Sequence, residues 1–317
     1  MDFIPQFKPT GTISVSPPGG TGHHGHHGHP HPMPGFPHID FNFATATHVG
    51  FKALWIVFGL FTVGFVVSML MALRVEKKAR LFHWLSATVL GIAMISYFAM
   101  ATGHGVDMVK THWDGHAPER HILFREVYYA RYIDWLFTTP LLLVSLAFLA
   151  GLSPADTVLT ILFDLGMIVT GLLGGLTPAR WHDGEVARWS FFAVSCAFFL
   201  GIFYVLITGG VKAAGLRPRK TRGLFYLLAG MTAVLWTAYP IVFGLTEGAN
   251  KISVDAEIIA YGVLDVAAKL GFTFMLLSIH SHGDDDTYTL PDWFVSPRQG
   301  QAADGRGGYG AIRVGDE

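Results

Sequence analysis

Seven long apolar runs constrain the fold of this chain more than any other feature of its sequence. Each is close to the roughly 20 residues that an α-helix needs to cross a bilayer. The runs cover residues 51–73, 81–102, 128–149, 155–176, 186–208, 224–245 and 258–279. Of the 317 residues 51% are hydrophobic and only 14% are charged, against about 25% charged in an ordinary soluble domain. Because backbone polar groups in lipid must be bonded internally, we expect an all-α membrane protein, a bundle of seven transmembrane helices.

The basic residues between the runs predict the orientation of the bundle. Arginine and lysine gather in the first connection, at residues 74–80, and in the fifth, at residues 212–222. Connections rich in these residues stay in the cytoplasm. We therefore expect an extracellular N-terminus and a cytoplasmic C-terminus, in a multi-pass protein of the plasma membrane.

The remaining sequence predicts one helical domain, residues 48–282, between two tails. Residues 1–47 are rich in His, Gly and Pro and are expected to form a disordered extracellular tail, because they bury too little apolar surface to fold. Residues 283–317 are expected to form a flexible cytoplasmic tail. The imidazoles of HHGHHGHPHP at residues 23–32 are of a kind that binds Zn, Cu or Ni. Low complexity favours a solvated segment instead, and we assign no metal site.

Lys269 lies deep in the last apolar run, with Asp265 about one helical turn before it. An ionised side chain inside a membrane is costly unless it is paired, and such residues usually have a function. Two interpretations remain open at this point. The two residues form a structural ion pair across one helical turn, or the buried amine is a nucleophile that forms a Schiff base.

The third run carries a stripe of polar residues, Arg131, Asp134, Thr138 and Ser145. Eleven residues separate Asp134 from Ser145, so they lie about 20° apart around a helix and about 16 Å apart along it. Aromatic rings accompany these charges, in Trp135 and in the LWTAYP segment of the sixth run. A purely structural network has the same composition. Rings beside buried charges also suit a flat, conjugated cation held between helices.

Three motifs, RYIDWLFTTPLLL at residues 131–143, LWTAYP at residues 235–240 and LDVAAK at residues 264–269, resemble those of the microbial rhodopsins, in the same order. The chain is similar to bacteriorhodopsin-like retinal proteins from about residue 51 to residue 280. The resemblance implies seven helices around all-trans retinal, bound to Lys269 as a Schiff base, in a protein that is not an enzyme. It also implies the lipid bilayer, protons and internal waters as partners, a possible trimer or pentamer, and no binding of nucleic acid.

The resemblance also implies a role for individual residues. Asp134 and Asp265 would be the counter-ions, with Asp134 the proton acceptor, Arg131 the gate, and Thr138 a hydrogen-bond donor to the acceptor. Asp164 would be a buried neutral acid near the far end of retinal. Further residues would line the retinal pocket: Tyr97, Trp135, Thr139, Leu142, Met167, Gly171, Phe192, Ser195, Phe199, Trp236, Tyr239 and Pro240.

Two acids, Glu247 and Glu257, align with the paired glutamates that release protons in haloarchaeal pumps. Paired acids in one site can share a proton, because ionising both is unfavourable. The alternative is that both are solvated carboxylates at the ends of a loop. The sequence leaves these two interpretations open.

Ser145 departs from the common pumps, which have Asp or Glu at this cytoplasmic proton-donor position. A serine hydroxyl does not titrate near neutral pH, so it cannot return a proton as a carboxylic acid would. We expect a light-driven outward proton pump with slow reprotonation, through water or another group such as His83. The alternatives are a sensory photoreceptor with a slow photocycle, a light-gated ion channel, and a seven-helix receptor or transporter for a diffusible ligand.

Overall fold

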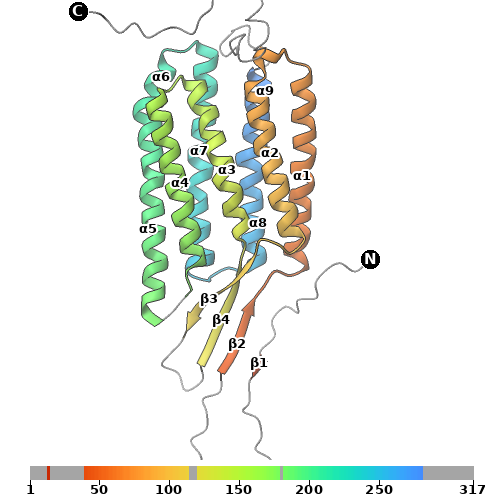
Figure 1. Cartoon of the computed structure of the whole chain (residues 1–317), viewed down its shortest axis with the longest axis vertical. Helices are drawn as coiled ribbons and strands as arrows, with labels where there is room; N and C mark the ends of the chain where they lie inside the picture. The colour runs from red at the N-terminus through yellow and green to blue at the C-terminus, as the bar shows by residue number, and fades with distance from the viewer. Residues whose placement is uncertain (1–12, 15–38, 114–119, 179–180, 281–317) are drawn as a thin grey trace, which may run out of the picture.

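The computed structural model describes residues 13–14, 39–113, 120–178 and 181–280. Within them, seven helical stretches are long and apolar enough to cross a membrane, and they lie side by side as a bundle (Figure 1). The first four are single helices: α1 (His48–Leu73), α2 (Leu81–Ala101), α3 (Tyr129–Ala150) and α4 (Pro154–Leu176). The predicted seven-helix membrane bundle is therefore confirmed, whereas the orientation of the two ends remains a prediction.

The last three spans each contain a turn of π-helix. The fifth consists of α5 (Trp181–Val205), η2 (Leu206–Gly210) and α6 (Val211–Gly215). The sixth consists of α7 (Arg219–Phe243) and η3 (Gly244–Gly248), and the seventh of α8 (Val254–Asp265), η4 (Val266–Gly271) and α9 (Phe272–His280). Single π-turns inside helices are rare and often mark functional sites. Here η4 contains Lys269 and η3 contains Glu247.

Local sequence signals account for several helix ends. The side chains of Thr47 and Ser253 accept hydrogen bonds from backbone N–H groups in the first turns of α1 and α8, as expected of N-cap residues. Gly151 ends α3 in the left-handed conformation, at φ 75°, which glycine adopts without a steric penalty. The short connection after Gly151 makes α3 and α4 antiparallel neighbours.

A four-stranded sheet at one end of the bundle was not predicted from the sequence. Its strands are β1 (Ile13–Ser14), β2 (Ile39–Ala44), β3 (Asp107–Trp113) and β4 (Arg120–Val127), in the spatial order β1-β2-β4-β3. Strands β3 and β4 are antiparallel and lie in the connection between α2 and α3, and β2 adds to β4 in parallel. We call the end of the bundle that carries these strands, at the bottom of Figure 1, the sheet end.

The prediction that residues 1–47 form a disordered tail is wrong for β2 and for the residues that join it to α1. The side chains of Phe41 and Phe43 pack on the ring of Phe124 in β4, so this part of the segment buries apolar surface against the hairpin. The apolar side chains of β2 alternate over only six residues. This pattern is too short to predict a strand beside a Gly- and Pro-rich stretch. The His-rich run and the predicted C-terminal tail lie outside the described residues.

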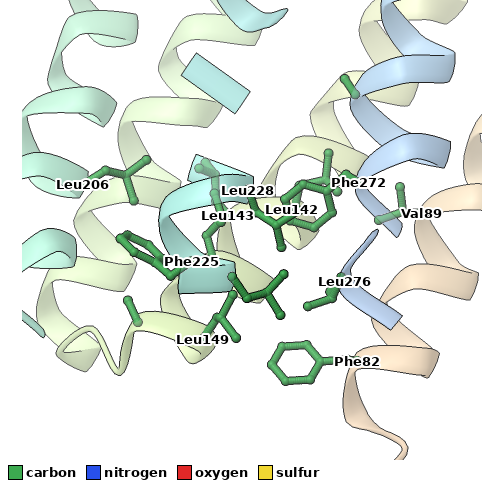
Figure 2. Packing of buried hydrophobic residues seen from close by; sticks show 14 of the residues in the cluster. Phe82, Val89, Leu142, Leu143, Leu149, Leu206, Phe225, Leu228, Phe272 and Leu276 are labelled. Carbon is green, nitrogen blue, oxygen red and sulfur yellow. The ribbon is translucent and has the colours of Figure 1, made fainter. Parts of the chain in front are cut away.

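The interior of the bundle is packed most tightly around α3. Of its apolar centre 61% is buried, the largest share among the seven described spans. At the end opposite the sheet, an apolar cluster joins α2, α3, α7 and α9, and includes Phe82, Leu149, Phe225 and Leu276 (Figure 2). Outward-facing residues such as Leu162 are apolar and exposed, as expected of surfaces that contact lipid. The polar residues of α3, Arg131, Asp134, Thr138 and Ser145, are at most 3% exposed, so this stripe faces the interior.

Candidate functional site

Lys269 lies between two carboxylates at the centre of the bundle. Its Nζ contacts Oδ2 of Asp134 directly and lies 3.2 Å from Oδ1 of Asp265. All three side chains are at most 2% exposed. A buried ammonium is tolerated only beside such partners, so the two pairings account for a charge in the middle of an apolar helix.

Three hydrogen-bond donors hold Asp265 in place. The hydroxyl of Tyr97 donates to Oδ2 at 2.7 Å, and Nε1 of Trp135 and the hydroxyl of Tyr239 donate to Oδ1 at 3.1 and 2.9 Å. Asp134 has fewer donors around it, namely Lys269 and the hydroxyl of Thr138. Its direct contact with Lys269 Nζ places it to receive a proton from that nitrogen.

A cavity extends from Lys269 between the helices. Its lining is mostly apolar and aromatic. Eleven residues predicted for the pocket line it: Trp135, Thr139, Leu142, Met167, Gly171, Phe192, Ser195, Phe199, Trp236, Tyr239 and Pro240. The predicted Tyr97 instead lies behind Asp265, on which its hydroxyl is bonded.

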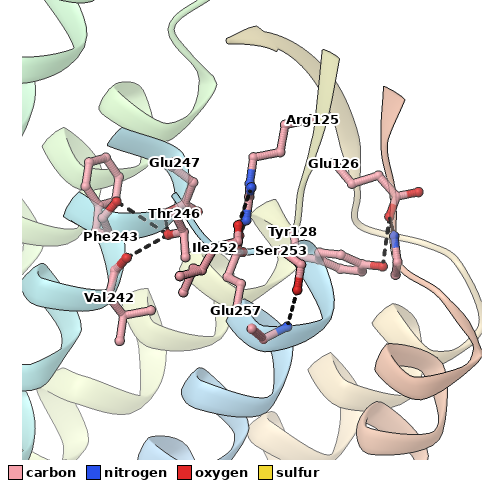
Figure 3. Close-up of polar contacts among 12 residues, drawn as sticks. Arg125, Glu126, Tyr128, Val242, Phe243, Thr246, Glu247, Ile252, Ser253 and Glu257 are labelled. Carbon is pink, nitrogen blue, oxygen red and sulfur yellow. Dashed lines mark hydrogen bonds and ion pairs between the residues drawn. The ribbon is translucent and has the colours of Figure 1, made fainter. Parts of the chain in front are cut away.

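A second buried cluster lies toward the sheet end (Figure 3). Arg131 does not pair with either carboxylate beside Lys269; its Nη1 donates to Oε1 of Glu257 at 2.9 Å. Arg125 of β4 donates to the other oxygen of Glu257, from Nη2 at 2.7 Å. Oε1 of Glu247 accepts a hydrogen bond from the hydroxyl of Tyr132 at 3.1 Å. Both glutamates are at most 1% exposed, so the alternative of solvated loop-end carboxylates is wrong.

The comparisons with known proteins agree with this geometry. Residues 51–282 match the family described as bacteriorhodopsin-like protein, and this range contains the helical bundle apart from the first three residues of α1. The chain belongs to this family. Its members are light-driven transporters and sensors rather than enzymes, and the chain is an integral membrane protein with seven spans.

Individual relatives support the family membership. Opsin-1 of Neurospora crassa is 34% identical over 293 residues, which are 91% of this chain and 92% of that protein. Archaerhodopsin-2 of a Halobacterium species is 41% identical over 203 residues, which are 64% of this chain and 73% of that protein. The solved structure of the light-driven proton pump LR (Mac) from Leptosphaeria maculans superposes with a TM-score of 0.73 at 38% identity, covering 76% of this chain and 99% of that one.

In this bacteriorhodopsin-like protein two predicted hydroxyl positions have clear contacts. Thr139 donates to Oδ2 of Asp164 at 2.8 Å beside the cavity, and Asp164 is fully buried. Thr138 donates to the backbone carbonyl oxygen of Asp134 at 2.8 Å, as threonines in helices commonly do. Its hydroxyl also lies within hydrogen-bonding reach of the Asp134 carboxylate, the partner that the sequence predicted.

The predicted donor position is buried and has no acid. Ser145 is 3% exposed and donates to the carbonyl oxygen of Leu141 at 2.9 Å. Its neighbours on α3, Leu142 and Leu146, belong to the apolar cluster opposite the sheet. His83, the other candidate on this side, is 1% exposed on α2 and is therefore inside the bundle rather than at its surface.

Sequence reasoning missed several residues of the site. Arg125 lies outside the apolar runs, so nothing in the sequence connected it to Glu257. Tyr261 lines the cavity and lies under the guanidinium of Arg131 at 4.3 Å from its ring centre, and its position four residues before Asp265 was a usable signal. The cavity is also lined by Tyr132, Ile168, Cys196, Phe243 and Ala268.

Proposed function

We propose that this bacteriorhodopsin-like protein is a light-driven outward proton pump that uses all-trans retinal bound to Lys269. The observation that carries the proposal is the contact of Lys269 with Asp134 and Asp265 at the end of an apolar cavity. In further support, similar solved structures from Leptosphaeria maculans and Coccomyxa subellipsoidea are described as light-driven proton pumps.

The residues present fit a long, conjugated aldehyde. The cavity is lined by rings, with Trp135 and Trp236 among them, and has few polar groups away from Lys269. Retinal, when bound through Nζ of Lys269, supplies visible absorption and a light-driven change in the proton affinity of that nitrogen. The direct contact of Asp134 with Lys269 and the three donors on Asp265 suit two roles, a proton acceptor and a fixed counter-ion.

The two buried clusters support a path for the proton. Asp134 accepts a proton from the nitrogen of Lys269, which leaves Asp265 as the remaining anion. Neutralisation of Asp134 leaves the positive charge of Arg131, which is already bonded to Glu257, less compensated, so ionisation of an acid in the sheet-end cluster becomes more favourable. A proton leaves from the cluster of Glu247 and Glu257. In this proposal the sheet end lies outside the cell and the basic connections lie in the cytoplasm. The membrane is the plasma membrane, and the proposed assembly, as in the family, is a trimer or pentamer.

Return of a proton from the cytoplasm is the slow step in this proposal. The position on α3 that would carry an acid is Ser145, whose hydroxyl is bonded to a backbone carbonyl. A proton must then enter through water or by way of another titratable group, and His83 of α2 is one on the same side. Slow return is also what a sensory photoreceptor needs, so Ser145 favours sensing as the second candidate function.

Illumination of intact cells in unbuffered medium separates these functions. A pump acidifies the medium, and a protonophore abolishes the change. A sensor produces no pH change but a long-lived blue-shifted absorption change, and a channel moves ions only along their gradient. If retinal addition to the purified protein produces no visible band, the chain is instead a receptor or transporter for a diffusible ligand.

A further inference from the structure

Glu257 is paired with two arginines at once. Its Oε2 accepts hydrogen bonds from Nη2 and Nε of Arg125, at 2.7 and 3.3 Å, and its Oε1 accepts one from Nη1 of Arg131 at 2.9 Å. The three side chains are at most 2% exposed. Charge-assisted hydrogen bonds are about twice as strong as neutral ones, so this surrounding favours the ionised form of Glu257.

Glu247 has a different environment, although it is equally buried. Its hydrogen-bond partners in the described part of the chain are hydroxyl groups, that of Tyr132 on Oε1 at 3.1 Å and that of Thr246 on Oε2 at 3.4 Å. Hydroxyl groups can donate to a carboxylate or accept from a carboxylic acid. The contacts of Glu247 are therefore compatible with a protonated side chain.

The charges of the Lys269 cluster and of the two arginines with Glu257 balance without a contribution from Glu247. Arg125 and Arg131 carry two positive charges, and ionised Glu257 balances one of them. Lys269 with two aspartates leaves one negative charge. These three cations and three carboxylates cancel. A further buried cation, Arg188, donates to backbone carbonyl oxygens, so an ionised Glu247 would have no cation directly bonded to it among the described residues, which is costly at such depth.

The sheet holds Arg125 where it can make these contacts. In β4 it is paired with Ala44 of β2 on one side and with Val109 of β3 on the other. Its Nη1 donates to the carbonyl oxygen of Ile252 at 2.9 Å, just before the N-cap of α8. The N-terminal strand and the hairpin therefore bring a cation from outside the bundle to an acid inside it.

We infer that Arg125 is a positioning residue that keeps Glu257 ionised, so that Glu247 alone holds the proton that is released. The inference rests on the proposed function for the release step, in which the proton leaves the Glu247 carboxyl group for bulk water. The released proton is then held by one acid rather than shared between two glutamates. The part of the chain before the first span thereby contributes to the release site.

Other titratable and charged groups near this pair set the background against which Arg125 acts. They come from β4, α3, α5, α8 and the residues between β4 and α3: Glu126, Tyr128, Arg131, Tyr132, Glu185, Arg188, Asp255 and Tyr261. None of them is changed in the variants below.

The test is an infrared titration of the full-length pigment in the dark, in which the carboxylic acid band of Glu247 is followed as the pH is raised. The band is identified by its loss in Glu247→Gln. In Arg125→Gln a cation is missing, so the state with both glutamates ionised becomes less favourable, and we expect the midpoint at which the pair loses its last proton to rise by about one pH unit or more. Arg125→Lys keeps the charge and should leave this midpoint near its parental value.

The matched control is Lys251→Gln, which removes an exposed cation from the loop that contains Ile252 and should leave the midpoint unchanged. An unshifted midpoint in Arg125→Gln, in protein with the parental visible band, would overturn the inference. So would an acid band that persists in Glu247→Gln and disappears in Glu257→Gln. The titration is done in the dark and does not depend on pumping. A pigment that fails to acidify the medium in the light would refute the proposed pump, whereas the dark titration alone decides the inference about Arg125.

Discussion

Replacing Lys269 with alanine should destabilise the retinal-free protein, because it leaves two carboxylates in the interior without their cation. Lys269 Nζ lies 3.2 Å from Oδ1 of Asp265, and at an effective dielectric constant of 20 one such contact corresponds to about 5 kcal/mol. The contact with Asp134 adds a second attraction. The cost of desolvating the ammonium opposes both, so their sum is not the net effect.

Removal of one partner from a buried ion pair costs about 3–5 kcal/mol in unfolding free energy. For a domain of this size each kcal/mol corresponds to about 2–4 °C in Tm. We therefore expect the midpoint of thermal unfolding of Lys269→Ala to fall by about 6–20 °C. Comparing both proteins without retinal excludes the stabilisation that ligand binding would add to one of them.

The assay is thermal unfolding in detergent, followed by circular dichroism at one scan rate for all variants. Asp134→Asn in the Lys269→Ala background removes one of the two unpaired charges and should recover a substantial part of the loss. Lys251→Ala, at an exposed lysine, serves as the control and should change little. If Lys269→Ala unfolds at the parental temperature, or if the second substitution lowers it further, the charge argument is wrong.

Three further predictions concern the proton path and the sheet. Asp134→Asn in the presence of retinal should shift the visible band to longer wavelength, because less negative charge stabilises the ground-state cation, and should abolish light-driven acidification; an unshifted band would contradict its role as counter-ion. Ser145→Asp should make recovery of the dark absorption after a flash at least about tenfold faster and less dependent on pH, whereas an unchanged recovery would show that Ser145 does not limit it. Burial raises the pKa of Glu126 above its usual value of 4.5, so the folded protein binds this proton more tightly than the unfolded one. Stability from this group should therefore rise as the pH falls through the raised pKa and level off below 4.5, and Glu126→Gln should remove this component from a plot of Tm against pH.

Much of the site could be predicted because its residues lie in long helices with strong motifs. The period of the helix places Asp134 and Ser145 on one face of α3, and apolar length alone requires that Lys269 be buried. The resemblance to the microbial rhodopsins identified eleven residues that line the cavity. The backbone bond of Thr138 was not predicted, because a hydroxyl in a helix has both a carbonyl and a side chain within reach.

The sequence by itself determined the seven spans, the charges inside them and the family. These features depend on the cost of placing polar groups in lipid and on side chains that lie within one helix, which can be read along the chain. The tertiary structure alone decided which acid each cation meets. Arg125 and Glu257 are separated by more than 130 residues, and only the pairing of β2, β3 and β4 brings the guanidinium to the carboxylate. Contacts of this kind depend on the path of the chain between elements, so no local period or motif predicts them.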